Sequence, residues 1–507
     1  MNSMGRDCPP LSSKTVQRPE LNHINDAQVA PRLKAGVIGP WGLAALVIGV
    51  TSPAIGLYAT WGPIEATAGP IAPLVFLAAL IITLPTVLSY ASLSRHAPSA
   101  GAAATWLWTT VNPTTGLLAG LVMILYFLMT AISVPLLFAL FFRDLVEWTH
   151  VEIPSMAVLA TGLVLQSALI AWVCLRGAEA SIKTTIRLML IETGVVLALS
   201  ATILWVKVGQ AGAVNLGPFN PAHATHGLSG FWAAIILGML AFSGFDVIAT
   251  AAEEAQAPRQ HVPRVLIIAV IGVALFWAVN AWVLTLSAPL TQVLEYNAEG
   301  LTAITPVARA YWGWGNVLVV ATAFTGLTAI YIASVQGASR LIFALARHGL
   351  LPSPFARLKG EKRVPQNAVL IVALTCVAMG LLSLAILHNG LDSFIWWSNA
   401  LVFFAALTYT GVNVANIVYF RRIAPEHFNV LRNMLVPIAG ICLNLYLIYA
   451  AFFSALWAAP FRTGKSVVVI CLALFALLLA SATCMRLFRR DLLTGSAPVS
   501  VDTTGGR

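Results

Sequence analysis

The chain has 507 residues, of which 59% are hydrophobic and only 9% are charged. A soluble protein of this length would expose too much apolar surface with such a composition, so the sequence indicates a polytopic membrane protein. The formal net charge is +10, but the basic residues fall in short loops, which argues against a nucleic-acid partner. The six cysteines show no spacing typical of a metal site or a disulfide framework, so no metal or cofactor is expected.

Residues 1–35 are polar and contain no apolar core followed by a cleavage signal. They predict a disordered cytoplasmic tail without a signal peptide. Residues 36–487 are expected to form a single transmembrane domain surrounded by membrane lipid. Residues 488–507 are expected to form a C-terminal cytoplasmic tail.

Apolar windows of about 20 residues, the length that crosses the hydrocarbon of a bilayer, recur along the chain. They cover residues 40–58, 71–93, 117–142, 154–174, 184–206, 229–252, 265–287, 313–336, 366–387, 394–420, 433–457 and 466–486. The sequence therefore predicts an all-α polytopic membrane protein with twelve transmembrane helices. An even number of spans places both ends of the chain on the same side.

Lysine and arginine predict the orientation. With the N-terminus inside, 24 of the 29 basic residues fall in segments on the inner side. The five left outside are Arg143, Lys207, Arg309, Arg462 and Lys465. By the positive-inside rule, both termini are predicted to be cytoplasmic, in a cell membrane.

The first window runs into residues that interrupt a helix. Pro53 removes a main-chain donor and clashes with the preceding turn, and Gly56 lowers the cost of irregular backbone. The candidate substrate-binding residues at this break are Thr51, Ser52, Ala54, Ile55 and Gly56.

The sixth window breaks at Ser243-Gly244-Phe245. Irregular main chain and a carboxylate survive inside hydrocarbon only where they face protein or a water-filled cavity. The candidate substrate-binding residues at this second break are Phe242, Ser243, Gly244, Phe245 and Asp246.

The two interrupted windows are five spans apart. Discontinuous helices at corresponding positions of two halves indicate a transporter site near the bilayer midplane. Exposed helix ends at such breaks present N–H groups to anions and C=O groups to cations. The structural alternative is that neighbouring helices simply satisfy an ordinary proline or glycine kink. The pairing of the breaks favours transport.

Several segments together resemble one known family. Ser89-Tyr90-Ala91-Ser92-Leu93 is followed by Pro98-Ser99-Ala100-Gly101, and the sixth window carries Phe242-Ser243-Gly244-Phe245-Asp246 with Glu253-Glu254 and Pro263-Arg264. Ser339-Arg340 precedes Ala344-Leu345-Ala346-Arg347-His348-Gly349-Leu350-Leu351-Pro352, and Pro365 opens the next span. These residues resemble the amino acid–polyamine–organocation permeases over roughly residues 36–425. The Thr51–Gly69 stretch looks most like the putrescine-importer branch.

This resemblance implies the five-plus-five inverted-repeat fold of the leucine transporter, with the first and sixth helices discontinuous. Repeat one would cover about residues 36–210 and repeat two about residues 225–425, with peripheral helices at about 430–487. Substrate would bind between the two breaks, with walls from the third, eighth and tenth helices.

One position departs from the family. Members that bind α-amino acids usually carry a Gly-Ser-Gly-type turn whose N–H groups hold the substrate carboxylate. Here the equivalent residues are Thr51-Ser52-Pro53-Ala54-Ile55-Gly56. Proline deletes a donor, and this favours an amine that lacks a carboxylate.

Glu192 is the clearest ionisable residue within a span. An unpaired carboxylate there costs about 2.5–3.5 kcal/mol on insertion scales. The resemblance aligns this position with one where some proton-coupled relatives carry a lysine that mimics a sodium ion, although the charge here is opposite. Our hypothesis is a protonatable coupling residue or a counter-charge for a cationic substrate. The alternative is a protonated side chain bonded to a neighbouring carbonyl.

Asp246 follows the second break, where it could cap the next half-helix or contact a substrate ammonium. Glu253 and Glu254 near the end of that half-helix are expected to pair with arginines at a cytoplasmic gate. The gating candidates on the basic side are Arg95, Arg259 and Arg264.

Aromatic side chains could form a cation–π wall against an ammonium group. Tyr126 is a candidate in the third window, and Trp396 and Trp397 are candidates in the tenth. Most tryptophans are expected to anchor at the membrane interface instead.

The sequence therefore predicts a permease rather than an enzyme. It would import an amino acid or a related amine or polyamine by alternating access, with a proton, or else sodium, as the coupling ion. The alternatives are an exchanger of amino acids or polyamines and, from another class, a transporter-like membrane sensor.

Overall fold

The computed structural model describes residues 36, 38–99, 101–148, 153–176, 182–211, 214–252, 255–347, 349–359, 364–453 and 463–488. In this part of the chain twelve helices are long and apolar enough to span a membrane. The predicted all-α class and the twelve spans are confirmed. The predicted tails, apart from Phe488, lie outside the described residues.

The spans follow the predicted windows in order. The first five are α1 (Pro40–Thr51) with α2 (Pro53–Ala68), α3 (Ala72–His96), α5 (Pro113–Glu147), α6 (Ser155–Leu175) and α7 (Ile182–Ala211). The next five are α8 (Gly227–Phe242) with α9 (Val247–Thr250), α10 (Pro258–Ser287), α13 (Val317–Arg347), α14 (Gln366–Leu387) and α15 (Gly390–Arg422). The last two are α16 (Val436–Ile448), flanked by π-helical turns at Leu431–Leu435 and Tyr449–Phe453, and α18 (Thr463–Phe488).

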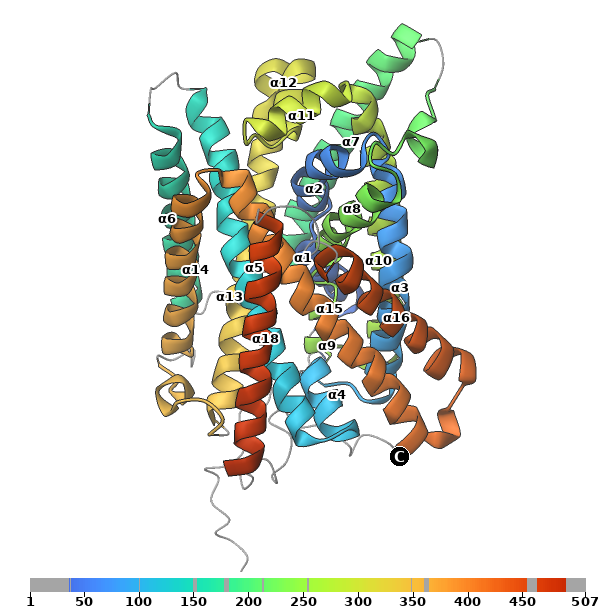
Figure 1. Cartoon of the computed structure of the whole chain (residues 1–507), viewed down its shortest axis with the longest axis vertical. Helices are drawn as coiled ribbons and strands as arrows, with labels where there is room; N and C mark the ends of the chain where they lie inside the picture. Colours follow the sequence, from blue (N-terminus) through green and yellow to red (C-terminus); the bar gives the residue numbers. More distant parts are fainter. Residues whose placement is uncertain are drawn as a thin grey trace, which may run out of the picture.

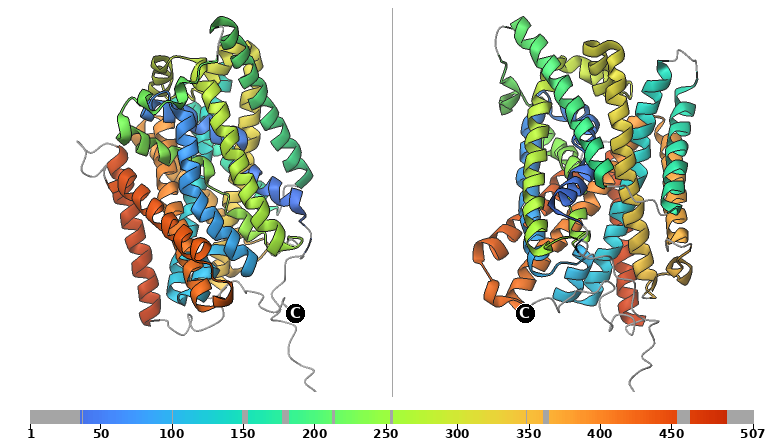
Figure 2. Two further views of the ribbon diagram at one scale, coloured as in Figure 1. Left: turned by 90° about the vertical axis from the view of Figure 1, so that its right-hand side faces the viewer. Right: turned by 180° about the vertical axis from the view of Figure 1, so that it is seen from behind.

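Short helices lie at the two ends of the bundle (Figure 1). α4 (Ala102–Thr110) lies at one end, and α11 (Leu290–Ala298) and α12 (Ile304–Trp312) lie at the other. The main chain before α1 meets the main chain after α9, where the Gln256 N–H donates to the Ile38 carbonyl at 2.8 Å. The side views show the long helices running between these two ends (Figure 2). They are called the α4 end and the α11–α12 end below.

The first span is the most enclosed. In the apolar window of α1 and α2, 72% of the residues are buried, against 22% in the window of α18. A helix that is apolar all round and buried all round must be covered by protein rather than by lipid. The interrupted first span therefore lies inside the bundle, whereas α18 is peripheral.

Buried amides and hydroxyls join α3, α15 and α16. Asn413 accepts a hydrogen bond from Ser89 Oγ at 2.6 Å and donates to Thr86 Oγ1 at 3.0 Å. Asn444 of α16 donates to the same Thr86 hydroxyl, and Asn433 donates to Asn416. Polar groups in an apolar environment are retained when they find partners. This network attaches the eleventh span to the core of the bundle.

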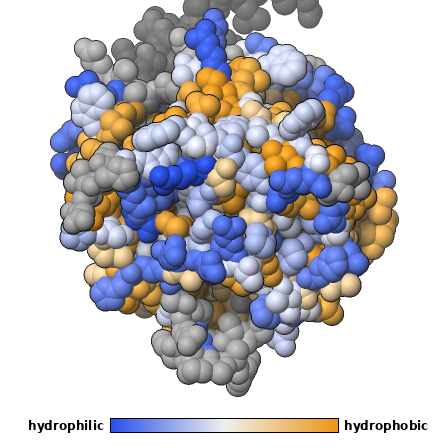
Figure 3. Space-filling model, turned by 90° about the horizontal axis from the view of Figure 1, so that it is seen from above, coloured by the Kyte–Doolittle hydropathy of each residue, from blue (hydrophilic) through white to orange (hydrophobic). Residues whose placement is uncertain are grey.

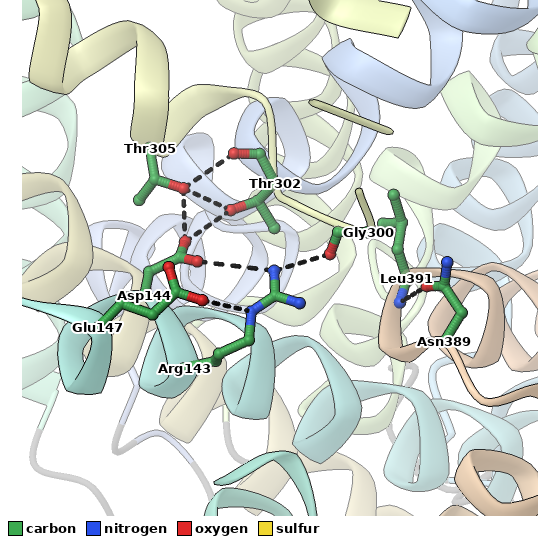
Figure 4. Close-up of polar contacts among 8 residues, drawn as sticks. All are labelled: Arg143, Asp144, Glu147, Gly300, Thr302, Thr305, Asn389 and Leu391. Atoms are coloured by element: carbon green, nitrogen blue, oxygen red, sulfur yellow. Dashed lines mark hydrogen bonds and ion pairs between the residues drawn. The ribbon is translucent and has the colours of Figure 1, made fainter. Parts of the chain in front are cut away.

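A second polar cluster attaches the α11–α12 end to α5 (Figure 4). Arg143 of α5 donates from Nη2 to the Gly300 carbonyl at 2.9 Å, and it lies 3.8 Å from the Asp144 carboxylate. Asp144 in turn accepts hydrogen bonds from the hydroxyls of Thr302 and Thr305. The side chains of Arg143 and Asp144 are only 8% and 7% exposed. The loop between α11 and α12 is therefore held against α5 by a buried charge pair.

The same loop also contacts the broken first span. Asn297 donates to the Gly62 carbonyl of α2 at 2.9 Å. A Cβ on Gly62 would lie 2.8 Å from that of Ala303, so the loop packs directly on α2. Hydrophilic and weakly polar side chains cover much of this end of the molecule (Figure 3). The α11–α12 segment thus forms a cover that contacts both α2 and α5.

We expect Asp144→Ala to lower the free energy of unfolding by about 3–5 kcal/mol, because it removes the buried partner of the Arg143 guanidinium and leaves only the exposed Glu147 carboxylate beside it. Denaturant titration in detergent measures this loss. The matched control is Glu147→Ala, whose carboxylate lies 3.6 Å from Arg143 but is 56% exposed, and which should cost at most about 1 kcal/mol. Equal losses in the two variants would contradict a buried charge pair at this point.

Candidate functional site

The first span is interrupted at Ser52, as the sequence predicts. Ser52 has φ 35° and ψ 108°, a conformation that no helix contains, and Pro53 opens α2 directly after it. The Ser52 hydroxyl accepts a hydrogen bond from the Ile55 N–H at 3.2 Å. Trp277 of α10 donates from Nε1 to the Pro53 carbonyl at 3.0 Å. Side chains thus replace the helical bonds that the break removes.

The sixth span is interrupted at residues 243–246, between α8 and α9. Gly244 has φ +102°, a backbone conformation that only glycine adopts without strain. A Cβ on Gly244 would also collide with Val50, near the end of α1. The two breaks therefore touch each other, and the predicted discontinuous first and sixth helices are confirmed.

A cavity of about 60 Å³ lies between the breaks. Its walls come from α1, α2, α5, α8, α13 and α15, together with the residue that follows α8. The lining residues are Val50, Thr51, Ile55, Gly56, Ala59, Thr60, Thr130, Ser133, Val134, Leu137, Leu240, Ala241, Ser243, Leu327, Ile330, Phe394 and Leu401. The third, eighth and tenth spans, which the sequence names as walls, are α5, α13 and α15.

Four of the candidate binding residues line this cavity, namely Thr51, Ile55, Gly56 and Ser243. Ser52, Ala54 and Gly244 belong to the breaks but do not line it. The sequence analysis missed Thr60, Thr130 and Ser133, which add three hydroxyls. In the sequence, each of these residues is marked only as a hydroxyl within an apolar span. Such hydroxyls are too common in membrane helices to identify a binding residue.

Tyr126 and Asp246 lie together but not at the cavity. The Tyr126 hydroxyl donates to Asp246 Oδ1 at 3.3 Å, and both side chains are buried. Asp246 occupies the N-cap position of α9, but its side chain makes no capping hydrogen bond. The expectation that its side chain caps the next half-helix is therefore wrong, and Tyr126 is its partner instead.

The two phenylalanines at the second break pack into the protein. Phe242 stands edge-on to Trp277, with ring centroids 5.1 Å apart. Phe245 lies between Tyr90 and Tyr409, at 5.5 and 5.0 Å. Neither ring lines the cavity, where Phe394 is the aromatic residue instead.

Glu192 of α7 bonds to the first break. Its carboxylate accepts a hydrogen bond from Ser52 Oγ at 2.7 Å and another from Thr325 Oγ1 of α13 at 3.3 Å. Ser52 also accepts from Ile55, a residue that lines the cavity. The carboxylate is therefore separated from the cavity wall by one side chain, and its partners are hydroxyl donors rather than a carbonyl.

The gating candidates are described only in part. Arg95, Arg259 and Arg264 are exposed near the α4 end of their helices. Glu253 and Glu254 lie outside the described residues. The expected ion pairs across this end remain a prediction.

The described part of the chain contains no group of three or more histidine, cysteine, aspartate or glutamate side chains that could hold a metal ion. The chemistry available at the cavity is therefore hydrogen bonding by hydroxyl groups, by main chain at the breaks and, one side chain away, by a carboxylate.

A sequence model of the family described as amino acid permease matches residues 38–485. The branched-chain amino acid permease of Lactococcus lactis is 27% identical over 62% of this chain and 68% of its own length. The low-affinity putrescine importer of Escherichia coli is 25% identical over 72% of this chain and 76% of its own length. The methylthioribose transporter of Bacillus subtilis is 24% identical over 82% and 89%.

Among solved structures, a manganese transporter of Eremococcus coleocola has the same fold. The TM-score is 0.58 over 92% of this chain and 99% of that protein, at 13% sequence identity. At this identity the likeness concerns the fold alone.

We expect Gly56→Ala to destabilise the protein by about 1–3 kcal/mol, because the added Cβ overlaps the Trp277 ring and the packed core must shift. Gly272→Ala in α10 is the control, since its added Cβ meets no other atom. The double variant Gly56→Ala/Trp277→Phe should lose less stability than the two single variants lose together, because the smaller ring makes room for the added Cβ even though the indole hydrogen bond to Pro53 is lost. Thermal unfolding in detergent measures the two single variants, the double variant and the control, and losses that simply add would argue against this contact.

Proposed function

The chain belongs to the amino acid permease family, and we propose that it is a secondary active transporter that imports an amino acid or a related amine. The family is one of permeases rather than enzymes. The observation that carries the proposal is the cavity between the two broken helices. Discontinuous helices that meet at a cavity are the usual construction of a transporter site.

The substrates named for the relatives are chemically diverse. They include branched-chain amino acids, putrescine and methylthioribose, and the identities all lie between 24% and 27%. The similarity to the putrescine importer therefore gives that branch no preference. The substrate has to be argued from the cavity of this chain.

We place the α4 end in the cytoplasm and the α11–α12 end outside the cell. The support is the positive-inside rule, because most of the lysine and arginine residues that the structure describes lie in segments at the α4 end. Import would then begin at the α11–α12 end and finish at the α4 end, in a cytoplasmic membrane.

The way the cover is attached supports the proposal of alternating access. The α11–α12 segment bonds to α2 through Asn297 of α11, and its loop bonds to α5 through Arg143. Opening the outer side requires α2 and α5 to separate, so at least one of these attachments has to break. A rocking motion of the helices around α1, α2 and α8 against α5 and α13 would do this.

Glu192 is the proposed coupling residue. Its hydrogen bond to Ser52 connects a group that can exchange a proton to the main chain of the first break. One proton driven by about 100 mV supplies roughly 2.3 kcal/mol, which supports about 40-fold accumulation of a neutral substrate. Sodium as the coupling ion is the alternative.

We expect Glu192→Gln to keep the fold and to abolish the dependence of uptake on a pH gradient. Glutamine can still accept from Ser52, but it carries no exchangeable proton at this position. Radiolabelled uptake into proteoliposomes, with and without an imposed pH gradient, measures the effect. The control is Glu295→Gln, an exposed carboxylate on α11, which should leave the gradient dependence as in the parent chain. A variant at Glu192 that still responds to the gradient would remove this residue from coupling.

Two other functions give different outcomes. An exchanger would show counterflow of substrate without any ion gradient and no net uptake driven by one. A membrane sensor would bind substrate in reconstituted vesicles without flux.

We expect a panel of amino acids and amines, measured at two pH values, to show net uptake that rises with an inward proton gradient.

A further inference from the structure

The cavity presents hydrogen-bond acceptors and few donors. Each of the five hydroxyl groups that line it donates its proton to a main-chain carbonyl of its own helix: Thr51 to Val47, Thr60 to Gly56, Thr130 to Tyr126, Ser133 to Thr130, and Ser243 to Met239. A hydroxyl has one proton and two lone pairs. With the proton committed, what remains for a ligand is the lone pairs.

The main chain at the first break adds few donors. Pro53 has no N–H, the Ile55 N–H is bonded to the Ser52 hydroxyl, and the Gly56 N–H is bonded to the Ser52 carbonyl. At most the Ala54 N–H is left in the first turn of α2. Most N–H groups at the helix end that could hold a carboxylate are therefore already bonded within the protein.

The charges around the cavity favour a cation. The C-terminal ends of α1 and α8 meet at the breaks, and the C-terminus of a helix carries partial negative charge. The N-terminal end of α2 at the same break carries partial positive charge, but most of its N–H groups are already bonded within the protein. The Glu192 carboxylate lies behind Ser52, and among the described residues that line the cavity there is no lysine, arginine or histidine.

Much of the remaining wall is hydrocarbon. It is formed by Val134 and Leu137 of α5, Ile330 of α13, and Phe394 and Leu401 of α15. A second charged group placed against these side chains would be buried without a partner, which is costly. This wall fits an aliphatic or branched apolar group.

We infer that the substrate is a primary monoamine with a compact aliphatic body and no carboxylate. An ammonium group brings three donors to a cavity of acceptors, whereas a carboxylate brings only acceptors. The inference rests on the proposed function and narrows its substrate to a class that is neither an α-amino acid nor a diamine.

The test compares three compounds that share one amine and differ in whether a carboxylate or a second amine is also present. Isopentylamine is leucine without its carboxylate, and putrescine is a diamine of similar length. We expect uptake of radiolabelled isopentylamine by the full-length chain in proteoliposomes to exceed that of leucine by at least about tenfold, since a carboxylate without donors forfeits more than one hydrogen bond. Uptake of isopentylamine should also exceed that of putrescine.

The outcomes separate the inference from the proposed function. Leucine taken up as well as isopentylamine would overturn the inference and leave the chain a permease. A preference for putrescine over isopentylamine would overturn it as well, because it would mean that the apolar wall accepts a second charged group. If neither these compounds nor any member of the amino acid and amine panel is transported, the proposed function fails and the inference fails with it.

Two variants test the donor argument directly. Pro53→Ala restores a main-chain N–H at the break and should raise leucine uptake relative to isopentylamine. Pro63→Ala, in the same helix but ten residues beyond the break, should leave the ratio unchanged. Thr130→Val removes an acceptor without changing the shape of the side chain, and it should lower isopentylamine uptake severalfold. Thr67→Val, whose hydroxyl bonds to the Pro63 carbonyl away from the cavity, is its control. Ratios and rates equal to those of the controls would count against the inference.

Discussion

A helix that is interrupted inside a bilayer must find partners for every main-chain group that the interruption frees, because the hydrocarbon offers none. At the first break of this protein, that requirement is met by two side chains. Ser52 accepts from the Ile55 N–H and donates to Glu192, and Trp277 donates to the Pro53 carbonyl. The Ser52 hydroxyl and the Trp277 indole therefore stabilise the break before any ligand is considered, and Glu192 orients the Ser52 hydroxyl. The position of the cavity follows from the position of these bonds.

The same requirement explains the polar residues that lie far from the cavity. Asn413, Asn416, Asn433 and Asn444 join three spans through buried amides, and Arg143 with Asp144 attaches the α11–α12 segment to α5. In lipid, two apolar helices gain little by touching each other, so polar contacts and close packing decide which helices are neighbours. Charged and amide groups thus fix the arrangement of helices, whereas hydroxyls on the inner helices shape the site.

The sequence predicted the spans and both breaks from local composition, and the resemblance to the permease family implied the helices that wall the cavity. Hydrocarbon length requires the windows. Pro53 removes a main-chain donor and Gly244 permits a positive φ, so both favour an interruption where they stand. It did not predict which face of a wall helix looks inward. A helix such as α5 is apolar on every side, so no polar face marks the exterior, and Thr130 and Ser133 could not be separated from other hydroxyls. Because the sequence does not mark the inward face, Phe242 and Phe245 were expected at the cavity, but they pack against Trp277, Tyr90 and Tyr409.

The asparagines of the polar network were visible in the sequence as amides in apolar runs. Ser89, which bonds to Asn413 and Asn416, lies more than 300 residues before them, so the sequence did not identify it as their partner.

The second half of the first span, α2, connects the cavity to the α11–α12 segment that covers one end of the bundle. α2 has 16 residues, which makes it about 24 Å long and stiff over that length. One end begins at Ser52, beside Glu192, and the other end carries Glu65, which accepts a hydrogen bond from Thr285 of α10. Between them, Gly62 bonds to Asn297 next to the loop that Arg143 holds. A rigid helix cannot tilt at one end without displacing the other. Any change in the bond between Ser52 and Glu192 that moves the start of α2 must therefore strain its contact with α11, and release of that contact must disturb the break. This mechanical connection needs no path of intermediate side chains, since a single helix supplies it.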